Sequence, residues 1–433
     1  MSQTITDRAQ APKIIIPETV NIAKAKKYIL SNGKAVHIIN QGLPDLVRFE
    51  AIFNAGTVKD QNPILPDITN AMLDEGTERH TSKELAEKLD FLAANLNLNV
   101  GKHTASLTVH SLKKHFGEVM ELLVEMMTQP KFSENELDIV RRHQYQNYLI
   151  RRENTDKLAS DRFWEVIFGE NHPYGISVKA EDYHKMQPED LHRFHKEYYR
   201  PQEALFLLSG RPDASTKKIL DKHLQPFELE ELDGFSFSNT DLAPSRQMQH
   251  RVHKKDAVQA SLRIGKATIN KTHPDYIKLS IANVLLGGYF GSRLMTNIRE
   301  DKGYTYGIYS SIGSLFASGY FLISAETQHK SVNAAVEEIR KELRKLREEL
   351  VSDEELTIVK HYLLGSLLEN FDGTDATARS FKSVYFYGLD ESWFMKYIEQ
   401  LKKITPEEIR QTAQKYLHED SMYEVICADT KAI

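Results

Sequence analysis

Histidine and cysteine carry much of the metal-binding and nucleophilic chemistry of proteins, and this chain has 17 histidines but one cysteine. The pairs His192/His195 and His250/His253 are each spaced by three residues, so both rings of a pair can share one helix face. Neither pair has an evident third ligand, and we interpret both as structural or surface residues. The sequence contains neither His-Glu-x-x-His nor His-x-x-Glu-His. Cys427 lies in the strand-like run YEVICAD, which favours a small buried side chain over a nucleophile.

The overall composition is that of a globular protein, with 433 residues, 41% hydrophobic and 27% charged residues, and a net charge of −5. No half is strongly basic, so nucleic acid is not an expected partner. No apolar run has the length of a membrane span, and the first residues lack the apolar core of a secretory signal. These features predict a cytoplasmic protein with no membrane partner. A periplasmic location stays open, because a signal that had already been removed would leave the same trace.

Two blocks of the sequence recur at nearly the same offset. SENELDIVRRHQYQNYLIRRENTD (133–156) aligns without a gap with SDEELTIVKHYLLGSLLENFDGTD (352–375). QPEDLHRFHKEYYRPQEALFLLSG (187–210) likewise resembles TPEEIRQTAQKYLHEDSMYEVICA (405–428). The chain is therefore predicted to be a duplication of a module of about 220 residues. The matched pairs in the first block are Ser133/Ser352, Glu136/Glu355, Leu137/Leu356, Ile139/Ile358, Val140/Val359, Leu149/Leu368, Thr155/Thr374 and Asp156/Asp375.

The elements follow the same order in both copies. A sequence in which apolar and polar residues alternate, as in a strand, comes first. It is followed by a helix, further strands, two long amphipathic helices and a last strand. In the second copy, Val336, Ile339, Leu343, Leu346 and Leu350 mark one helix face. We expect an α+β fold of two homologous modules, each a mainly antiparallel sheet with helices packed on one side. The modules would span 1–225 and 248–433, joined by a polar, acidic linker at 226–247.

Several sequence segments resemble, in the same order along the chain, segments of the family of pitrilysin, insulin-degrading enzyme and mitochondrial processing peptidase. EGTERHTSKELAEKLDFLAANLNLNVGKHTASLTV (75–109) is similar to the segment that follows the active-site helix of that family. HPYG (172–175) and EYYRPQEALFLLSG (197–210) resemble the end of its N-terminal module. GSRLMTNIREDKGYTYGIYSS (291–311) resembles a signature of its C-terminal module. The resemblance extends over roughly residues 25–430 and implies the fold of a zinc metallopeptidase.

Active copies in that family carry His-x-x-Glu-His on a helix just before a Gly-Thr pair. Residues i and i+4 share a face and bind zinc together, and the glutamate takes a proton from the bound water. Counted back from Gly-Thr at 76–77, the corresponding residues here are Asp67, Asn70 and Ala71. Asn70 cannot act as a general base, and Ala71 has no donor atom. The downstream helix offers only Glu136 or Asp138 as a further ligand, so the resemblance implies a module that has lost its zinc site.

The C-terminal module of the family contributes an arginine and, seven residues later, a tyrosine, which hold the substrate and stabilise the oxyanion. The resemblance assigns these roles to Arg299 and Tyr306, because guanidinium and phenol groups are donors suited to that task. Tyr304 is an alternative at a register two residues earlier. Without the resemblance, Arg299 would be interpreted as a charge at a helix end.

Together, the lost and retained residues predict a non-catalytic subunit of a heterodimeric zinc metallopeptidase. This chain would bind no metal and would be inactive alone; zinc is expected on a homologous partner subunit. Unfolded peptides would add as a strand to a sheet edge, contacting Asn97, Leu98 and Asn99. The alternative is a peptidase-inactive homodimer that binds peptides or serves as a scaffold, since the fold alone does not decide function. Activity of this chain alone with another metal is a third, weaker hypothesis.

Overall fold

The computed structural model describes residues 22, 24–227, 235, 241–429 and 431. Its strands form two separate sheets, one in each half of the chain. Each sheet contains one parallel pair of strands, Ala35–Asn40 with Leu205–Gly210 in the first and Gln249–His253 with Tyr423–Ala428 in the second, and the other pairs are antiparallel. The first sheet has the order β1-β2-β6-β3-β5-β4, formed by β1 (Ala25–Ile29), β2 (Ala35–Asn40), β3 (Leu46–Phe53), β4 (Asn95–Val100), β5 (Ala105–Leu112) and β6 (Leu205–Gly210). The second has the order β7-β11-β8-β10-β9, formed by β7 (Gln249–His253), β8 (Ala260–Thr268), β9 (Thr305–Ser314), β10 (Gly319–Thr327) and β11 (Tyr423–Ala428).

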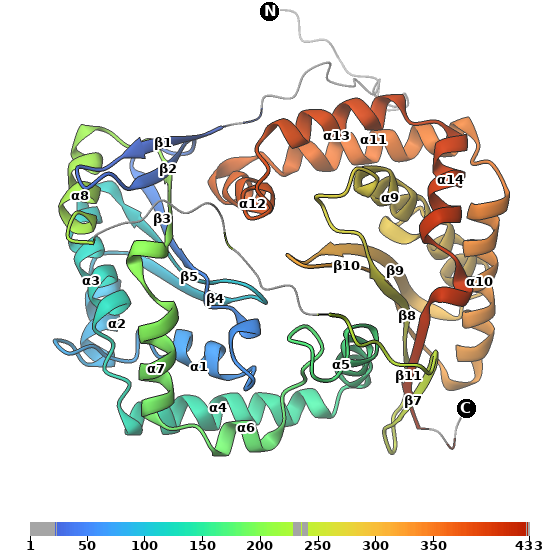
Figure 1. Cartoon of the computed structure of the whole chain (residues 1–433), viewed down its shortest axis with the longest axis horizontal. Coiled ribbons are helices and arrows are strands. Elements are labelled where there is room, and N and C mark those ends of the chain that lie inside the picture. The colour runs from blue at the N-terminus through green and yellow to red at the C-terminus, as the bar shows by residue number, and fades with distance from the viewer. Residues whose placement is uncertain (1–21, 23, 228–234, 236–240, 430, 432–433) are drawn as a thin grey trace, which may run out of the picture.

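Helices surround both sheets, as Figure 1 shows. Those of the first half are α1 (Leu65–Ala71), α2 (Ser82–Phe91), α3 (Phe116–Thr128), α4 (Glu134–Arg152), α5 (Thr155–Phe168), α6 (Ala180–His184), α7 (Pro188–Tyr198) and α8 (Ala214–Leu224). Those of the second half are α9 (Tyr276–Asn283), α10 (Val332–Glu348), α11 (Asp353–Glu369), α12 (Gly373–Tyr385), α13 (Ser392–Lys403) and α14 (Pro406–Tyr416), with π-helical segments at Val284–Gly288 and Met295–Asp301. The predicted α+β fold of two homologous, mainly antiparallel modules is confirmed. Most of the expected linker at 226–247 lies outside the described residues.

The repeated sequence blocks form the same elements in both halves. The first block becomes α4 and the start of α5, and its counterpart becomes α11 and the start of α12. Both long helices begin alike, because the side chains of Ser133 and Ser352 accept hydrogen bonds from the backbone N–H groups of Glu136 and Glu355. The second block forms α7 and β6 in one half and α14 and β11 in the other.

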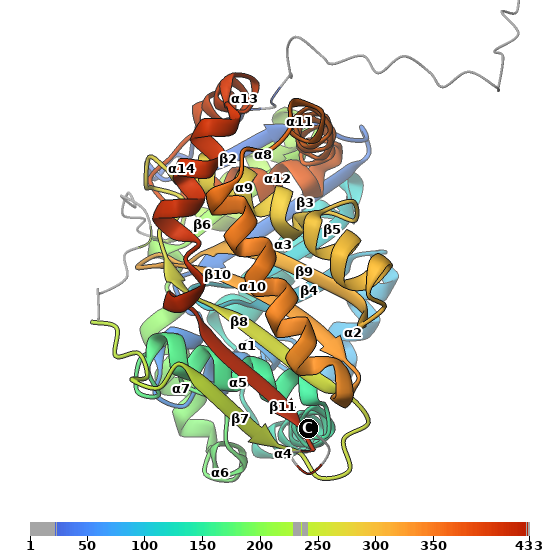
Figure 2. The ribbon, with the colours of Figure 1, turned by 90° about the vertical axis from the view of Figure 1, so that its right-hand side faces the viewer.

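Each half has its own apolar core between its sheet and its helices. Figure 2 looks onto the C-terminal half, where α10 crosses in front of the sheet. Four of the five predicted face residues of α10 are buried, namely Val336, Ile339, Leu343 and Leu346. The prediction was wrong for Leu350, which lies beyond the end of the helix at Glu348 and is 47% exposed. Cys427 is buried in β11, as its sequence context indicated.

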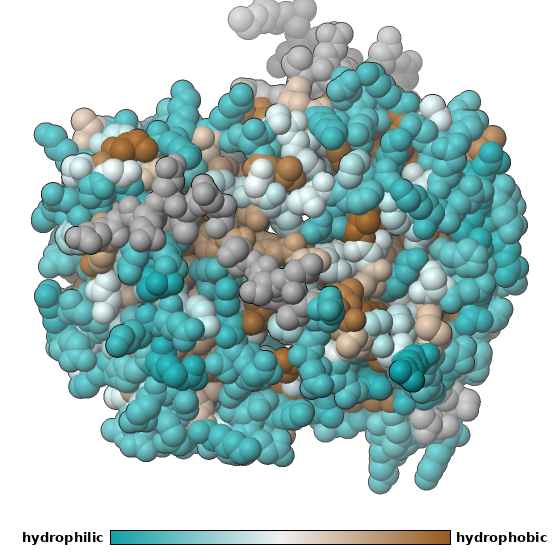
Figure 3. All heavy atoms as spheres, in the orientation of Figure 1, coloured by the Kyte–Doolittle hydropathy of each residue, from teal (hydrophilic) through white to brown (hydrophobic). Residues whose placement is uncertain are grey.

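The surface is mostly hydrophilic, and Figure 3 shows apolar residues gathered toward the middle of the viewed face. Within the described ranges, every helix is too short or too polar to cross a lipid bilayer.

The two halves exchange one helix each. Helix α5 belongs to the first half by sequence, but it packs on β8 and β11 of the second sheet. Helix α12 belongs to the second half and packs on β2 and β6 of the first sheet. Apolar residues of both exchanged helices fill the contacts: Phe163 and Ile167 of α5 cluster with Val425, and Phe381 of α12 clusters with Leu205. Each sheet is therefore covered on its second face by the other half of the chain.

A matching ion pair fixes each exchanged helix near its N-terminus. Arg263 of β8 is bonded to Asp156 in the first turn of α5. Arg48 of β3 donates from Nε to Oδ1 of Asp375 at 2.7 Å, in the first turn of α12. Asp156 and Asp375 are aligned in the sequence repeat, so the two pairs are equivalent contacts of one duplicated module. A carboxylate in the first helical turn also complements the helix dipole.

His103 forms a further contact between the halves, at the tip of the β9–β10 hairpin. Its Nε2 atom accepts a hydrogen bond from the backbone N–H of Phe316 at 3.2 Å, and its ring stacks on the Phe316 ring with centroids 3.8 Å apart. The hydroxyl of Tyr174 accepts from the N–H of Ala317 at 3.1 Å. Because Nε2 must accept, His103 has to be uncharged in this contact. Burial is the main cause that lowers the pKa of His103 to about 3.

This contact predicts acid sensitivity. The folded-state pKa of about 3 lies below the ordinary 6.5, so the neutral ring contributes full stability above pH 6.5 and loses it progressively between pH 6.5 and 3. At pH 5 the loss from this one group is about 2 kcal/mol, since each pKa unit corresponds to about 1.4 kcal/mol. Urea unfolding from pH 8 to pH 4 measures it. In His103→Gln, which does not titrate, the free energy of unfolding should depend less steeply on pH. An unchanged slope would contradict the assignment.

Candidate functional site

Helix α1 holds the positions that correspond to a zinc motif, and its residues are used for packing. Leu65, Ile68 and Asn70 are buried in the module core. Asn70 is only 2% exposed, and its side-chain oxygen accepts a hydrogen bond from the hydroxyl of Tyr199 at 2.9 Å. Ala71 presents a methyl group. The two positions that need a base and an imidazole are therefore occupied by a buried amide and an apolar side chain.

Asp67 is the one ionisable side chain of the three positions. Burial raises its pKa to about 6, while Arg151 and Lys102 act in the opposite direction. The pKa of Lys102 is in turn lowered by burial, against the carboxylates of Asp161 and Asp67. Asp67 thus belongs to a mixed group of acidic and basic side chains, in which cations of the protein supply the positive charge near the carboxylate.

The other candidate metal ligands do not assemble around α1. Asp138 pairs with Arg141 in the first turns of α4. The ring Nε2 of His195 lies 2.9 Å from the carbonyl oxygen of Met127 and is placed to donate to it, and burial is the main cause that lowers the pKa of this histidine to about 4. His250 contacts the carbonyl of Gln247 in the same way at 2.9 Å. Within the described ranges no group of three or more His, Cys, Asp or Glu side chains could hold a metal, so the residues present do not fit a zinc ion.

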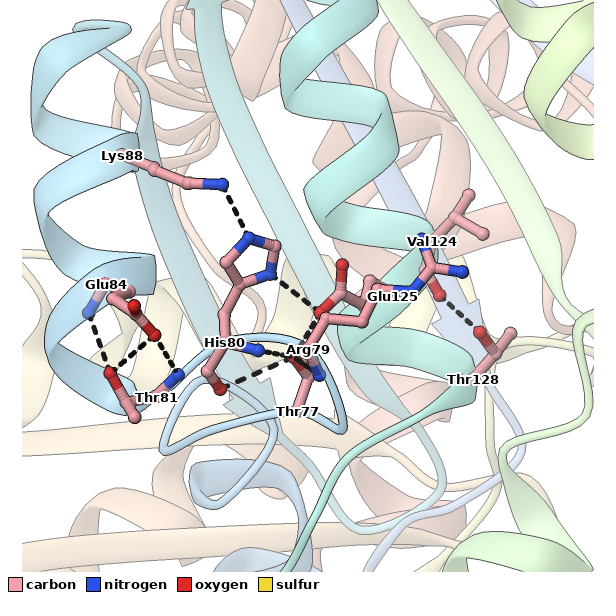
Figure 4. A network of polar contacts seen from close by, with 9 residues as sticks. All are labelled: Thr77, Arg79, His80, Thr81, Glu84, Lys88, Val124, Glu125 and Thr128. Atoms are coloured by element: carbon pink, nitrogen blue, oxygen red, sulfur yellow. Dashed lines mark hydrogen bonds and ion pairs between the residues drawn. The ribbon is translucent and has the colours of Figure 1, made fainter.

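The Gly-Thr loop after α1 is held by a polar network from the neighbouring helices, shown in Figure 4. Glu125 of α3 accepts from the hydroxyl of Thr77 and lies 2.8 Å from Nδ1 of His80. On the other side of that ring, Nε2 lies 2.5 Å from the ammonium of Lys88. Burial raises the pKa of Glu125, but its hydrogen bonds to Thr77 and His80 outweigh burial and bring it below the ordinary value. These contacts give the Gly-Thr signature a structural role.

Strand β4 forms a free edge of the first sheet beside α1. It pairs with β5 alone, and α1 packs against it. The residues expected to contact peptide alternate along this edge: Asn97 and Asn99 are exposed, and Leu98 is half-buried against the core. A strand with one unpaired side is the geometry required for adding a peptide strand. Peptide contact by Asn97, Leu98 and Asn99 stays a prediction.

Strand β9 forms the equivalent free edge of the second sheet, and it carries Tyr306. Opposite Glu326 the register shifts, so that Tyr306 and Gly307 together face one residue of β10. The hydroxyl oxygen of Thr305 lies 2.6 Å from the carbonyl oxygen of Glu326 and accepts from the N–H of Gly307 at 3.0 Å. Such a bulge changes the direction of a side chain. Tyr306 is 91% exposed, without a hydrogen-bond partner among the described residues.

The structure distinguishes the two tyrosines that the sequence left open. Tyr304 is partly buried and packs against the core of the C-terminal half. Tyr306, two residues later, points into solvent at the edge of the sheet. Tyr306 is thus the more exposed of the two phenols, and its choice over Tyr304 stays a prediction.

Arg299 lies on the π-helical segment Met295–Asp301, which packs against β9. Its guanidinium carbon is 4.6 Å from the centroid of the Phe290 ring, a cation–π contact that holds the side chain in place. No contact joins Arg299 directly to Tyr306 in the described structure. Phe290 is 60% exposed, and its sequence context offered no reason to single it out.

Comparison with known proteins identifies relatives along most of the chain. Residues 65–170 match the model for insulinase (peptidase family M16), and residues 185–363 match the model for the peptidase M16 inactive domain. An uncharacterized zinc protease YmxG of Bacillus subtilis is 23% identical over 91% of this chain and 96% of its own length. A non-peptidase homolog YmxG of Helicobacter pylori is 26% identical over 86% and 85%.

Solved structures have the same fold. A peptidase M16 inactive domain from Pseudomonas fluorescens superimposes with a TM-score of 0.83 at 23% identity, covering 94% of this chain and 98% of its own. A protease from Helicobacter pylori gives a TM-score of 0.82 at 16% identity, covering 94% and 100%. The matched residues include α1 in the first half and β9 in the second, so both sets of motif positions lie inside them. The chain belongs to peptidase family M16.

Proposed function

We propose that this chain is the non-catalytic subunit of a two-chain M16 peptidase, to which it supplies Arg299 and Tyr306. The observation that carries the proposal is a contrast within one molecule. At the zinc-motif positions the polar side chain of Asn70 is buried and bonded to Tyr199, whereas Tyr306 is almost fully exposed and has no hydrogen-bond partner among the described residues. A module that had lost all function would have no reason to keep a phenol free in that way.

The proposed roles follow from the chemistry of the two side chains. A phenol can donate a hydrogen bond to the oxygen that becomes negative as a peptide carbonyl is attacked. A guanidinium carries a permanent charge and several fixed donors, which suit the carbonyl oxygens of an extended peptide. The Phe290 ring restricts Arg299 to a defined direction before substrate arrives, so less side-chain entropy is lost on binding.

Because the residues at the motif positions of α1 do not fit zinc, the proposal places the metal on another chain. A homologous subunit with an intact His-x-x-Glu-His would provide the metal ligands and the general base. An unfolded peptide would pair with a free strand edge in the space between the subunits. The name of the Helicobacter relative, non-peptidase homolog, agrees with a member of this family that does not hydrolyse peptides alone.

Purification from the native host tests the pairing. The tagged chain is expected to retain, in equimolar amount, a homologous protein with a complete His-x-x-Glu-His motif. The isolated chain should hydrolyse no peptide, and the reconstituted pair should hydrolyse one and lose activity with a chelator. Recovery of the chain only as a homodimer would contradict the two-chain enzyme and support the scaffold alternative.

A further inference from the structure

A cavity of about 330 Å³ lies within the C-terminal half, between α9, α11, α12 and α13. Its walls include several aromatic side chains: Tyr276 from α9, and Trp393, Phe394 and Tyr397 from α13. This volume is in the range of small-molecule sites, which are typically apolar hollows with a few polar groups. Neither Arg299 nor Tyr306 is among its lining residues, so the cavity is distinct from the features assigned to peptidase function.

Two cations line this cavity without a compensating carboxylate. Lys271, in the loop before α9, and Arg379 of α12 are its charged lining residues, and no Asp or Glu is among the lining residues described. In the described part of the chain, neither cation forms an ion pair. The ammonium of Lys271 donates to the carbonyl oxygen of Ser383 at 2.9 Å and lies 4.9 Å from the Trp393 ring centroid. A half-buried charge with so few partners is costly unless a ligand supplies the opposite charge.

Most uncharged polar groups of the wall are already bonded within the protein, so the preference for an anion comes from the two cations. The hydroxyl of Ser380 donates to the carbonyl of Asn370 at 2.7 Å, and that of Ser383 donates to the carbonyl of Ser380 at 2.9 Å. The hydroxyl of Ser366 has no partner among the described residues and is free to donate. An aromatic wall could by itself attract a cationic ligand. Lys271 already occupies the region over Trp393 and would repel a second cation.

We infer that this cavity binds a small organic anion, a carboxylate or phosphate with an aromatic or branched apolar body. The charged group would be held by Lys271 and Arg379, and the apolar body would pack against Trp393 and Phe394. The site is independent of the proposed peptidase role, since it needs neither a partner subunit nor a metal.

Such a ligand would also act on the contact between the two halves. Arg379, Ser380 and Ser383 are on α12, whose Ala378 and Phe381 pack against the sheet of the N-terminal half. An anion bound to one side of α12 would therefore stabilise the helix that joins the halves. Saturation with ligand is expected to raise the unfolding temperature of the whole chain, as required when a ligand binds only the folded state.

The test compares probes that differ only in charge. N-acetyl-phenylalanine, benzoate and phenyl phosphate are the anionic probes, and N-acetyl-phenylalaninamide is the neutral match. The chain has two tryptophans, so replacing Trp164 by phenylalanine leaves the emission of Trp393 as the reporter. At least one anion should change that emission saturably, and the amide should not. Equal binding of acid and amide, or no saturable binding of any of the three anions, would overturn the inference.

Variants assign the binding to the two cations. Lys271→Gln and Arg379→Gln should each weaken binding at least tenfold, whereas Lys396→Gln, an exposed lysine of α13, should bind as the parent does. Arg379 is exposed, so its replacement tests the site even if Lys271→Gln folds poorly. If both single variants, Arg379→Gln and Lys271→Gln, fold and still bind the anion with parental affinity, the role of these side chains is contradicted.

The pH dependence supplies a second readout. Burial lowers the pKa of Lys271 to about 8, so its charge is lost as the pH rises through that value. The other ionisable groups around the cavity are Arg379 and the tyrosines Tyr276, Tyr387 and Tyr397, and burial raises the pKa values of the three tyrosines above the ordinary 10. Affinity for the anion should therefore fall between pH 7 and 9. A constant affinity over this range would count against Lys271.

Discussion

Replacing Tyr306 by phenylalanine is expected to lower the turnover of the two-chain peptidase about 10²–10³-fold, the usual effect of removing one oxyanion donor. The variant lacks only the phenolic oxygen, and the exposure of Tyr306 means that no hydrogen bond of the folded chain is lost with it. Its folding and its affinity for the partner should therefore match the parent. The measurement is turnover of a peptide by the reconstituted pair, at saturating partner subunit.

Two neighbouring tyrosines provide controls for this prediction. Tyr309 is also on β9 and is 50% exposed, and Tyr304 packs against the core. Tyr309→Phe and Tyr304→Phe should each leave turnover close to the parental value, because neither hydroxyl donates to the oxyanion in this proposal. Parental turnover in Tyr306→Phe would remove the proposed catalytic role. A loss of partner binding in that variant would instead indicate a tyrosine that holds the subunits together.

Removal of the carboxylate that binds Arg263 is the second large effect that we expect. Arg263 is buried, and Asp156→Ala leaves its charge without an ionic partner, which should cost about 3 kcal/mol in the free energy of unfolding. The equivalent change in the other half, Asp375→Ala, should cost about 1 kcal/mol or less. The difference arises because Asp375 is about half exposed and because Arg48 keeps a second carboxylate, Glu50, at 2.8 Å.

Urea unfolding of the two variants measures this difference, and a double variant isolates its cause. If the cost comes from an unpaired buried charge, Asp156→Ala combined with Arg263→Leu should be more stable than Asp156→Ala alone. Both arginines are buried, so equal losses in the Asp156 and Asp375 variants would show that neither the exposure of Asp375 nor the second carboxylate beside Arg48 determines the effect.

The local and repetitive parts of the fold were predictable from the sequence. The Ser-x-x-Glu motifs that cap the N-termini of α4 and α11 can be recognised in the sequence. The gapless alignment of the repeat placed both helices in equivalent positions. The end of α10 was placed too far along the chain, because Leu350 continues the apolar spacing although the backbone leaves the helix after Glu348. The spacing of apolar residues indicates which of them could share a helix face, but it does not indicate the residue at which the helical backbone hydrogen bonding ends.

Contacts between distant segments were not predictable in the same way. The repeat contained Asp156 and Asp375, but nothing near them in sequence pointed to arginines on β3 and β8 of the opposite half. The difference in exposure between Tyr304 and Tyr306 accompanies a bulge in β9, which only the pairing with the opposing strand reveals. Lys271 and Arg379, the two cations that line the cavity of the C-terminal half, lie more than 100 residues apart in sequence, with no motif around either.

The exchange of α5 and α12 has a consequence for the origin of the chain. If a single ancestral module had this pattern, one face of its sheet would have been bare unless a second copy donated a helix to it. Such a module would have existed as a symmetric dimer with swapped helices, a common route to self-association. Gene duplication and fusion would then have turned an intermolecular contact into an intramolecular one, and the equivalent arginine–aspartate pairs would be what remains of that symmetry.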